Sequence, residues 1–120
     1  MRVHLVKEQT IADYCAKHPA SKAGFEEWLA KVKLADWKVA EHIQATFGSA
    51  DLLGGGSERV VFNIGGNSYR MICRYKFART MVHLSIKFIG THAEYNKLCG
   101  TDKNKKKRPQ DPDQFTVNLY

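Results

Sequence analysis

Residues 59–95 read RVVFNIGGNSYRMICRYKFARTMVHLSIKFIGTHAEY. Within this stretch, three runs alternate between apolar and polar residues, at 59–64, 67–76 and 81–89. Successive side chains of a β-strand point to opposite faces, so the alternation predicts three strands that each have one apolar face. The pair Gly65-Gly66 can supply the positive φ angles of a tight hairpin turn, and residues 77–80 make a second short connection. The stretch therefore predicts an antiparallel sheet.

The two faces of this predicted sheet differ in charge. The face expected to be apolar in the second and third strands carries Tyr69, Met71, Cys73, Tyr75, Val82, Leu84, Ile86 and Phe88, with Ile89 on the other side. That other face gathers Arg59, Asn63, Arg70, Arg74, Lys76, His83 and Lys87 and no acidic strand residue. Such a surface favours phosphate groups. An ordinary solvated face of an antiparallel sheet is the alternative that stays open.

The length, composition and charge of the chain limit the classes of protein to which it can belong. The chain has 120 residues, 43% of them hydrophobic, and a formal net charge of +7. These values predict one folded domain at residues 1–100, with a basic tail at residues 101–120. The excess of cations favours an anionic partner, such as nucleic acid or an acidic protein.

The cysteines give no sign of a disulfide framework or a metal site. There are three, without CxxC spacing and without a secretory signal, so we expect reduced thiols and a cytoplasmic protein. A zinc site made from Cys73, Cys99, His83 and His92 has no recognised spacing. We therefore expect no metal and no cofactor. No apolar run is long enough to span a bilayer, so we expect no membrane partner.

The first half of the chain reads as mainly helical. Residues 1–5 alternate like a short strand that could join the sheet, and residues 9–17 predict a helix that stops before Pro19. Ser21 is the predicted N-cap of a second helix, which is followed by a third at residues 39–47 and by a glycine-rich connection at 52–57. The apolar stripe of the second helix is Phe25, Trp28, Leu29 and Val32, and that of the third is Val39, Ile43 and Phe47.

The last part of the chain begins with a short helix, predicted at residues 91–99, in which Thr91 and Glu94 have the spacing of a capping box. Residues 115–120 alternate like a strand, although a frayed terminus explains them equally well. The whole pattern predicts an α+β fold, in which an N-terminal strand and two or three helices pack on a small, mainly antiparallel sheet.

Several short sequence motifs resemble one family. They are similar to the HigB toxins of type II toxin–antitoxin systems, within the RelE-like superfamily. The motifs are residues 59–67, Tyr69-Arg70, residues 90–95, residues 35–37 and residues 47–51. The likeness covers residues 1–99. It implies a ribosome-dependent endoribonuclease that cuts mRNA and inhibits translation, and that is neutralised by a HigA-like antitoxin with a helix-turn-helix domain.

RNA can be cut without metal if its own 2′-hydroxyl attacks the neighbouring phosphorus. His92 and Tyr95 lie three residues apart on the predicted helix, so an imidazole and a phenol share one side of its first turn. Arg70 belongs to the Tyr69-Arg70 motif that resembles the family, and it is the predicted phosphate-binding residue. The remaining candidates are Lys87 and Lys76 for charge neutralisation in catalysis, and Arg59, Asn63 and Arg74 for RNA binding.

Other interpretations of these residues stay open. His92 could simply bond to nearby backbone at a helix start, and Tyr95 could be packing against the sheet. As a whole, the chain could be a non-enzymatic module that binds RNA, the ribosome or an antitoxin through the basic face. It could also be an adaptor that adds its terminal strand to a partner's sheet.

Overall fold

The computed structural model describes residues 1–54, 56–66 and 68–98. Cys99 and the predicted tail and terminal strand at 101–120 lie outside the described residues. In chain order the elements are β1 (Arg2–Val6), α1 (Gln9–Lys17), a 3-10 turn (Pro19–Ser21), α2 (Lys22–Leu34), α3 (Glu41–Thr46), β2 (Asp51–Leu53), β3 (Arg59–Ile64), β4 (Tyr69–Phe77), β5 (Met81–Thr91) and α4 (His92–Leu98). The predicted α+β class is confirmed.

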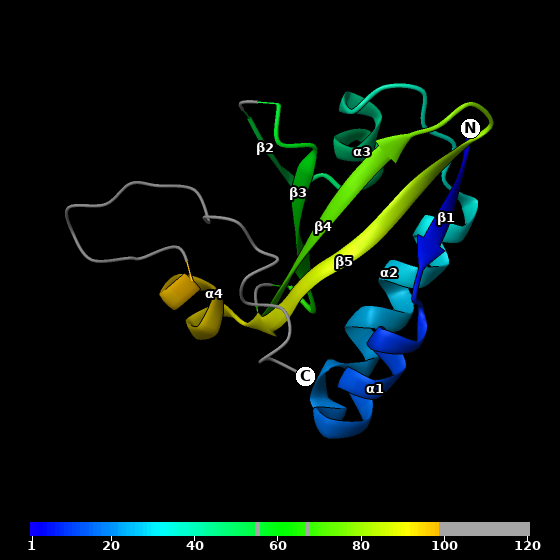
Figure 1. The fold of residues 1–120 in the computed structure, drawn as a ribbon. Coiled ribbons are helices and arrows are strands. Elements are labelled where there is room, and N and C mark those ends of the chain that lie inside the picture. The colour runs from blue at the N-terminus through cyan, green and yellow to red at the C-terminus, as the bar shows by residue number, and fades with distance from the viewer. Residues whose placement is uncertain (55, 67, 99–120) are drawn as a thin grey trace.

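The strands form one five-stranded sheet in the order β1-β5-β4-β3-β2 (Figure 1). The three predicted strands are its centre, and both of their connections are antiparallel hairpins. Gly65 and Gly66 have φ angles of 63° and 71°, the left-handed region that glycine enters at little cost. The N-terminal strand does join the sheet, and it runs parallel to β5 at one edge. None of the described helices is long and apolar enough to cross a membrane.

The main core lies between one face of the sheet and the helices α1, α2 and α3. The predicted stripe of α2 supplies Phe25, Trp28 and Val32, all buried. Trp28 meets Phe62 of β3 edge to face, with ring centroids 5.2 Å apart. Aromatic burial of this kind contributes a large apolar area per residue, which explains how a short chain supports a closed core.

A β-bulge changes the side on which two residues of β5 lie. Ile72 pairs with Phe88 and Cys73 pairs with Ile86, so Lys87 is an extra residue in β5. Phe88, expected on the helix side, instead joins a second small core on the opposite face, and Ile89 joins the main core. The expectation for both residues was wrong, because one inserted residue reverses the alternation that follows it.

Four smaller expectations also need correction. Residues 52–57 were expected to be a connection, but Leu52 and Leu53 belong to β2 and pair with β3. The third helix spans only Glu41–Thr46, and Val39 is 48% exposed. Ser21 makes no side-chain cap to α2, because its hydroxyl donates to the carbonyl of His18. The last helix begins at His92, and Thr91 is the final residue of β5.

Candidate functional site

Arg70 and Tyr95 meet on the face of the sheet opposite α1 and α2. The guanidinium carbon of Arg70 lies 5.4 Å from the centre of the Tyr95 ring, which is cation–π geometry. In the sheet Arg70 is flanked by Asn63 of β3 and Gly90 of β5. Its Nε is buried and has no hydrogen-bond partner among the described residues. The ring of Tyr95 therefore restricts the position of the Arg70 guanidinium.

Local sequence explains why the Tyr95 helix lies at this position. Helix α4 follows β5 directly, and the predicted capping box starts it. The Thr91 N–H donates to Glu94 Oε1 over 2.8 Å, and the Glu94 N–H donates to Thr91 Oγ1 over 3.1 Å. Tyr95 then packs beside Phe88, and Leu98 adds to the same small core. The bulge in β5 thus builds the surface on which α4 rests.

His92 is half-buried at the start of α4. Its backbone N–H donates to the carbonyl of Ser68 over 3.1 Å, which ties the helix start to the beginning of β4. The Asn96 side-chain amide nitrogen lies 3.1 Å from His92 Nδ1, within hydrogen-bond distance. Nε2 is therefore the ring nitrogen that Asn96 does not contact.

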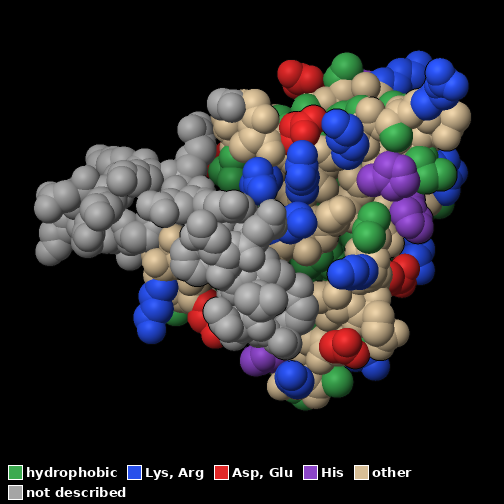
Figure 2. Space-filling model, in the orientation of Figure 1, with side chains coloured by type: hydrophobic (Ala, Val, Ile, Leu, Met, Phe, Trp, Pro, Cys, Tyr) green, Lys and Arg blue, Asp and Glu red, His purple; other side chains and the backbone are tan. Residues whose placement is uncertain are grey.

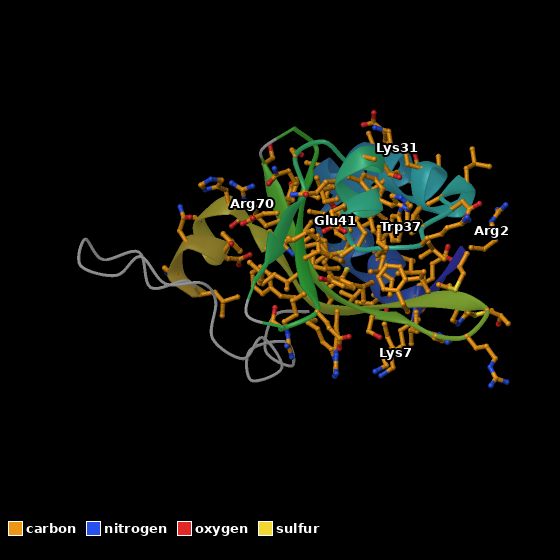
Figure 3. All side chains as sticks on the ribbon, turned by 90° about the horizontal axis from the view of Figure 1, so that it is seen from above. Arg2, Lys7, Lys31, Trp37, Glu41 and Arg70 are labelled. Atoms are coloured by element: carbon orange, nitrogen blue, oxygen red, sulfur yellow. The ribbon has the colours of Figure 1, made fainter. Side chains whose placement is uncertain are left out.

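Asn63 lies beside Arg70 and connects β3 to the segment before β2. Its side-chain amide donates to the carbonyl of Ser49 over 3.1 Å, at the point where the chain turns into β2. Because Asn63 and Arg70 are register partners, their Cα atoms lie about 5 Å apart. Figure 3 shows Arg70 at the α4 end of the sheet and Arg2 at the opposite end.

The other predicted cations form a separate group on the same face. Arg59 pairs with Arg74 and Lys76 pairs with His83 in the register of β3, β4 and β5. Figure 2 shows Lys and Arg side chains gathered over these strands. Lys76 lies six residues beyond Arg70 on β4, roughly 20 Å at about 3.4 Å per residue, so the structure does not bring it to the Arg70–Tyr95 pair.

Two further features qualify this basic face. Arg74 forms an ion pair with Glu58 at 3.5 Å, and Arg59 donates to the carbonyl of Ser57 over 3.1 Å. Glu58, an acidic residue just before β3, therefore offsets part of the positive charge of this face. Lys87 lies at the bulge in β5, between Gly90, which pairs with Arg70, and Ser85, which pairs with Arg74.

Sequence reasoning missed two residues of this face. Asn96, which orients the His92 ring, follows it by four residues, the spacing of neighbours on a helix, and that spacing was available in the sequence. His4 lies edge to face against His83, with centroids 5.7 Å apart. The alternation of residues 1–5 put His4 on the polar side of its strand, but only the parallel pairing of β1 with β5 gave it this neighbour.

A comparison with protein families identifies the chain. Residues 21–98 match the model of the HigB toxin family, the RelE-like toxic component of a toxin–antitoxin system. The chain belongs to this family. The predicted resemblance is confirmed, and membership implies a cognate antitoxin as a partner.

Individual HigB relatives resemble the chain over most of its length. The mRNA interferase toxin HigB of Escherichia coli strain K12 is 26% identical over 106 residues, which cover 88% of this chain and all of the relative. The mRNA interferase HigB of Shigella flexneri gives the same values. That of Escherichia coli O6:H1 is 24% identical over 96 residues, 80% of this chain and 91% of the relative. The predicted endoribonuclease activity agrees with these names.

Proposed function

We propose that this HigB-family toxin is an endoribonuclease that cuts mRNA on the translating ribosome in the cytoplasm. A HigA-like antitoxin with a helix-turn-helix domain neutralises it. The observation that carries the proposal is the contact of the Arg70 guanidinium with the Tyr95 ring, at the same end of the sheet as His92. The names of the relatives, all mRNA interferases, support the same activity.

The proposed reaction needs no metal ion. The 2′-oxygen of a nucleotide attacks the adjacent phosphorus, and its proton passes to a base. The bond to the 5′-oxygen breaks, and that oxygen takes a proton, so the products are a 2′,3′-cyclic phosphate and a 5′-hydroxyl. Arg70 donates to the phosphate oxygens as negative charge builds up in the transition state. His92 exchanges a proton with the RNA at Nε2, because Asn96 occupies Nδ1.

The remaining predicted residues have supporting roles in this proposal. Tyr95 offers an aromatic face on which an unpaired base can stack, beside the arginine that it holds. Lys87 adds positive charge near the bulge. Arg59 and Arg74 bind the RNA backbone, and Lys76 acts with them rather than in the chemical step, because it lies far along β4.

The test is to map the 5′ ends of mRNA from cells expressing the wild type, Arg70→Ala and His92→Ala, with translation running and with translation blocked. Each variant is checked for folding by circular dichroism. We expect cleavage to fall about 100-fold or more in both variants and to stop when translation is blocked. Arg79→Ala is the matched control, because it removes an equal charge at an exposed position between β4 and β5. Undiminished cleavage by both folded variants would refute the proposed roles.

A second candidate is a non-enzymatic RNA-binding module. The rows of cations beyond Arg70, formed by the pairs Arg59–Arg74 and Lys76–His83, favour it, since they bind backbone without any chemistry. This candidate predicts RNA binding that weakens steeply with salt and no new 5′ ends. The same mapping experiment therefore separates the two.

A further inference from the structure

Two histidines lie side by side at the β1 edge of the sheet. His4 of β1 and His83 of β5 are register partners, and their rings meet edge to face with centroids 5.7 Å apart. Lys76 of β4 is the register partner of His83 on the other side. Register partners project from the same side of a sheet, so two imidazoles and an ammonium form one row across three strands. We call these three residues the histidine row.

The histidine row faces away from the helices. His83 lies between Val82 and Leu84, which are both fully buried in the main core. Because side chains alternate along a strand, His83 and its register partners project from the opposite face of the sheet. His4 and Lys76 are exposed there, and His83 is half-buried. Figure 2 shows histidine side chains side by side on this face, with Lys and Arg side chains around them.

We propose that the histidine row binds a phosphate group of ribosomal RNA, and that the two histidines make this binding stronger as the pH falls. The inference rests on the proposed function, because it adds a contact with the ribosome to the same basic face. An imidazole is neutral at about pH 8 and charged at about pH 5, whereas a phosphodiester stays negative throughout. A phosphate beside the row favours the charged imidazole, so binding takes up protons.

The row offers cations that have no other partner, unlike the cations nearer β2. Arg74 forms an ion pair with Glu58 at 3.5 Å, and Arg59 donates to the carbonyl of Ser57 over 3.1 Å. Lys76 has neither a hydrogen bond nor an ion pair with any described residue. A phosphate that binds at the row therefore displaces no partner among the described side chains.

The charged side chains next to the row on its three strands are positive. Arg2 precedes His4 by two residues on β1, and Arg74 precedes Lys76 by two residues on β4. The positions two residues before and after the histidine of β5 are Met and Ser, which carry no charge. These strands therefore supply no carboxylate for a charged imidazole, and the counter-charge has to come from a ligand.

The acidic residues that border these strands already have cationic partners. Asp36 is paired with the N-terminal ammonium. Glu8 forms an ion pair with Lys33 at 3.7 Å, and Glu58 forms one with Arg74 at 3.5 Å. Within the part of the chain that the structure describes, the row is thus an anion-binding surface whose charge depends on pH.

The row is too far from Arg70 to act on the phosphate that is cut. Lys76 and Arg70 are six residues apart on β4, roughly 20 Å at about 3.4 Å per residue. The two histidines should therefore change the affinity for the ribosome and leave the chemical step as it is. This separates their pH dependence from that of His92, which acts on the rate.

Binding to vacant 70S ribosomes of Escherichia coli, which carry no mRNA to cut, tests the inference. The affinity is measured at pH 8 and pH 6 at constant ionic strength. We expect the wild type to bind about threefold to tenfold more tightly at pH 6, since one unit of differential protonation is worth about tenfold. The double variant His4→Gln/His83→Gln should bind like the wild type at pH 8 and gain little at pH 6.

Two further variants make the test specific to the charge of the row. His4→Lys keeps a positive charge at both pH values, so we expect it to bind at pH 8 about as tightly as the wild type binds at pH 6. His18→Gln is the matched control, because it removes an imidazole that stacks on Tyr14 on the helix side of the sheet. Circular dichroism at both pH values checks that each variant is folded.

Several results would overturn the inference. One is a wild-type affinity that does not change with pH, and another is an equal gain in the folded double variant. A gain in affinity for the cognate antitoxin but not for ribosomes would assign the row to a protein partner. A lower cleavage rate of the double variant at saturating ribosomes would place the histidines in the reaction. Should the chain bind ribosomes as expected and yet cut no mRNA, the histidine row stands and the proposed endoribonuclease fails.

Discussion

The guanidinium of Arg70 lies against the ring of Tyr95, with 5.4 Å between the guanidinium carbon and the ring centre. These residues come from a central strand and from the helix that ends the described chain. Their contact explains how a flat sheet can present one ordered arginine. The ring restricts the long side chain, so less conformational entropy is lost when the arginine binds phosphate.

Substitution of Tyr95 separates the ring from its hydroxyl. Tyr95→Phe keeps the aromatic face over Arg70, whereas Tyr95→Leu removes it. We expect cleavage within about threefold of wild type for Tyr95→Phe and a loss of about tenfold or more for Tyr95→Leu, since a partly buried cation–π contact is worth about 1–2 kcal/mol. Single-turnover cleavage on programmed ribosomes measures both. Equal losses would show instead that the hydroxyl takes part.

Lys76→Ala tests whether the distant cations bind rather than catalyse. We expect weaker ribosome binding, with the slope of log affinity against log salt reduced by about 1, and an unchanged rate of cleavage at saturating ribosomes. Binding measured between low and physiological salt gives the slope. A lower rate of cleavage at saturating ribosomes would show instead that Lys76 takes part in the chemical step.

Gly90→Ala tests the packing between β5 and α4. An added Cβ would lie 2.6 Å from Phe88 Cζ and 2.8 Å from Glu94 Oε1, so the small core and the capping box must both shift. We expect a loss of about 1–3 kcal/mol in the free energy of unfolding, measured by urea denaturation. Gly48→Ala is the control, because an added Cβ there meets no described atom within 4 Å. Similar losses for both variants would contradict this account.

Tyr14→Phe tests a buried phenol. Burial, followed by the nearby charge of Glu94 and by Tyr69 and Cys15, raises the Tyr14 pKa to about 12. Because the folded pKa lies above the unfolded value of about 10, the wild type keeps its full stability below pH 10 and loses some of it as pH rises toward 12. We expect Tyr14→Phe to reduce that alkaline loss.

The same variant has an expectation at neutral pH. The Tyr14 hydroxyl is buried with no hydrogen-bond partner among the described residues, so its removal should leave the free energy of unfolding at pH 7 unchanged or higher. Thermal unfolding at pH 7 and above pH 10 measures both effects. A clear destabilisation at pH 7 would indicate a bound water on the hydroxyl.

Asp36→Asn tests the contact that fixes the first residue. A hydrogen bond from the N-terminal ammonium, together with its charge, lowers the Asp36 pKa. A carboxyl with a lowered folded pKa stabilises the fold above its ordinary value near 3.9 and loses that contribution as pH falls further. We expect the stability difference between wild type and Asp36→Asn to shrink below about pH 4, by acid titration of unfolding. A difference that is constant with pH would contradict the pairing.

Elements with a local signal are predicted correctly from the sequence. Alternation of side chains predicts the three central strands, and the paired glycines predict the turn between two of them. The spacing of Thr91 and Glu94 predicts the start of the last helix. These features depend on neighbours a few residues apart, so no folded structure is needed to recognise them.

Which side chains share a site depends on contacts between distant parts of the chain. The extra residue at Lys87 moved Phe88 to the other face and so made a surface for α4, and register put Asn63 rather than Lys76 beside Arg70. Trp28 of α2 packs against Phe62 of β3, more than thirty residues later in the chain. Pairing between distant strands depends on the packing of the whole chain, and one inserted residue reverses every side chain beyond it.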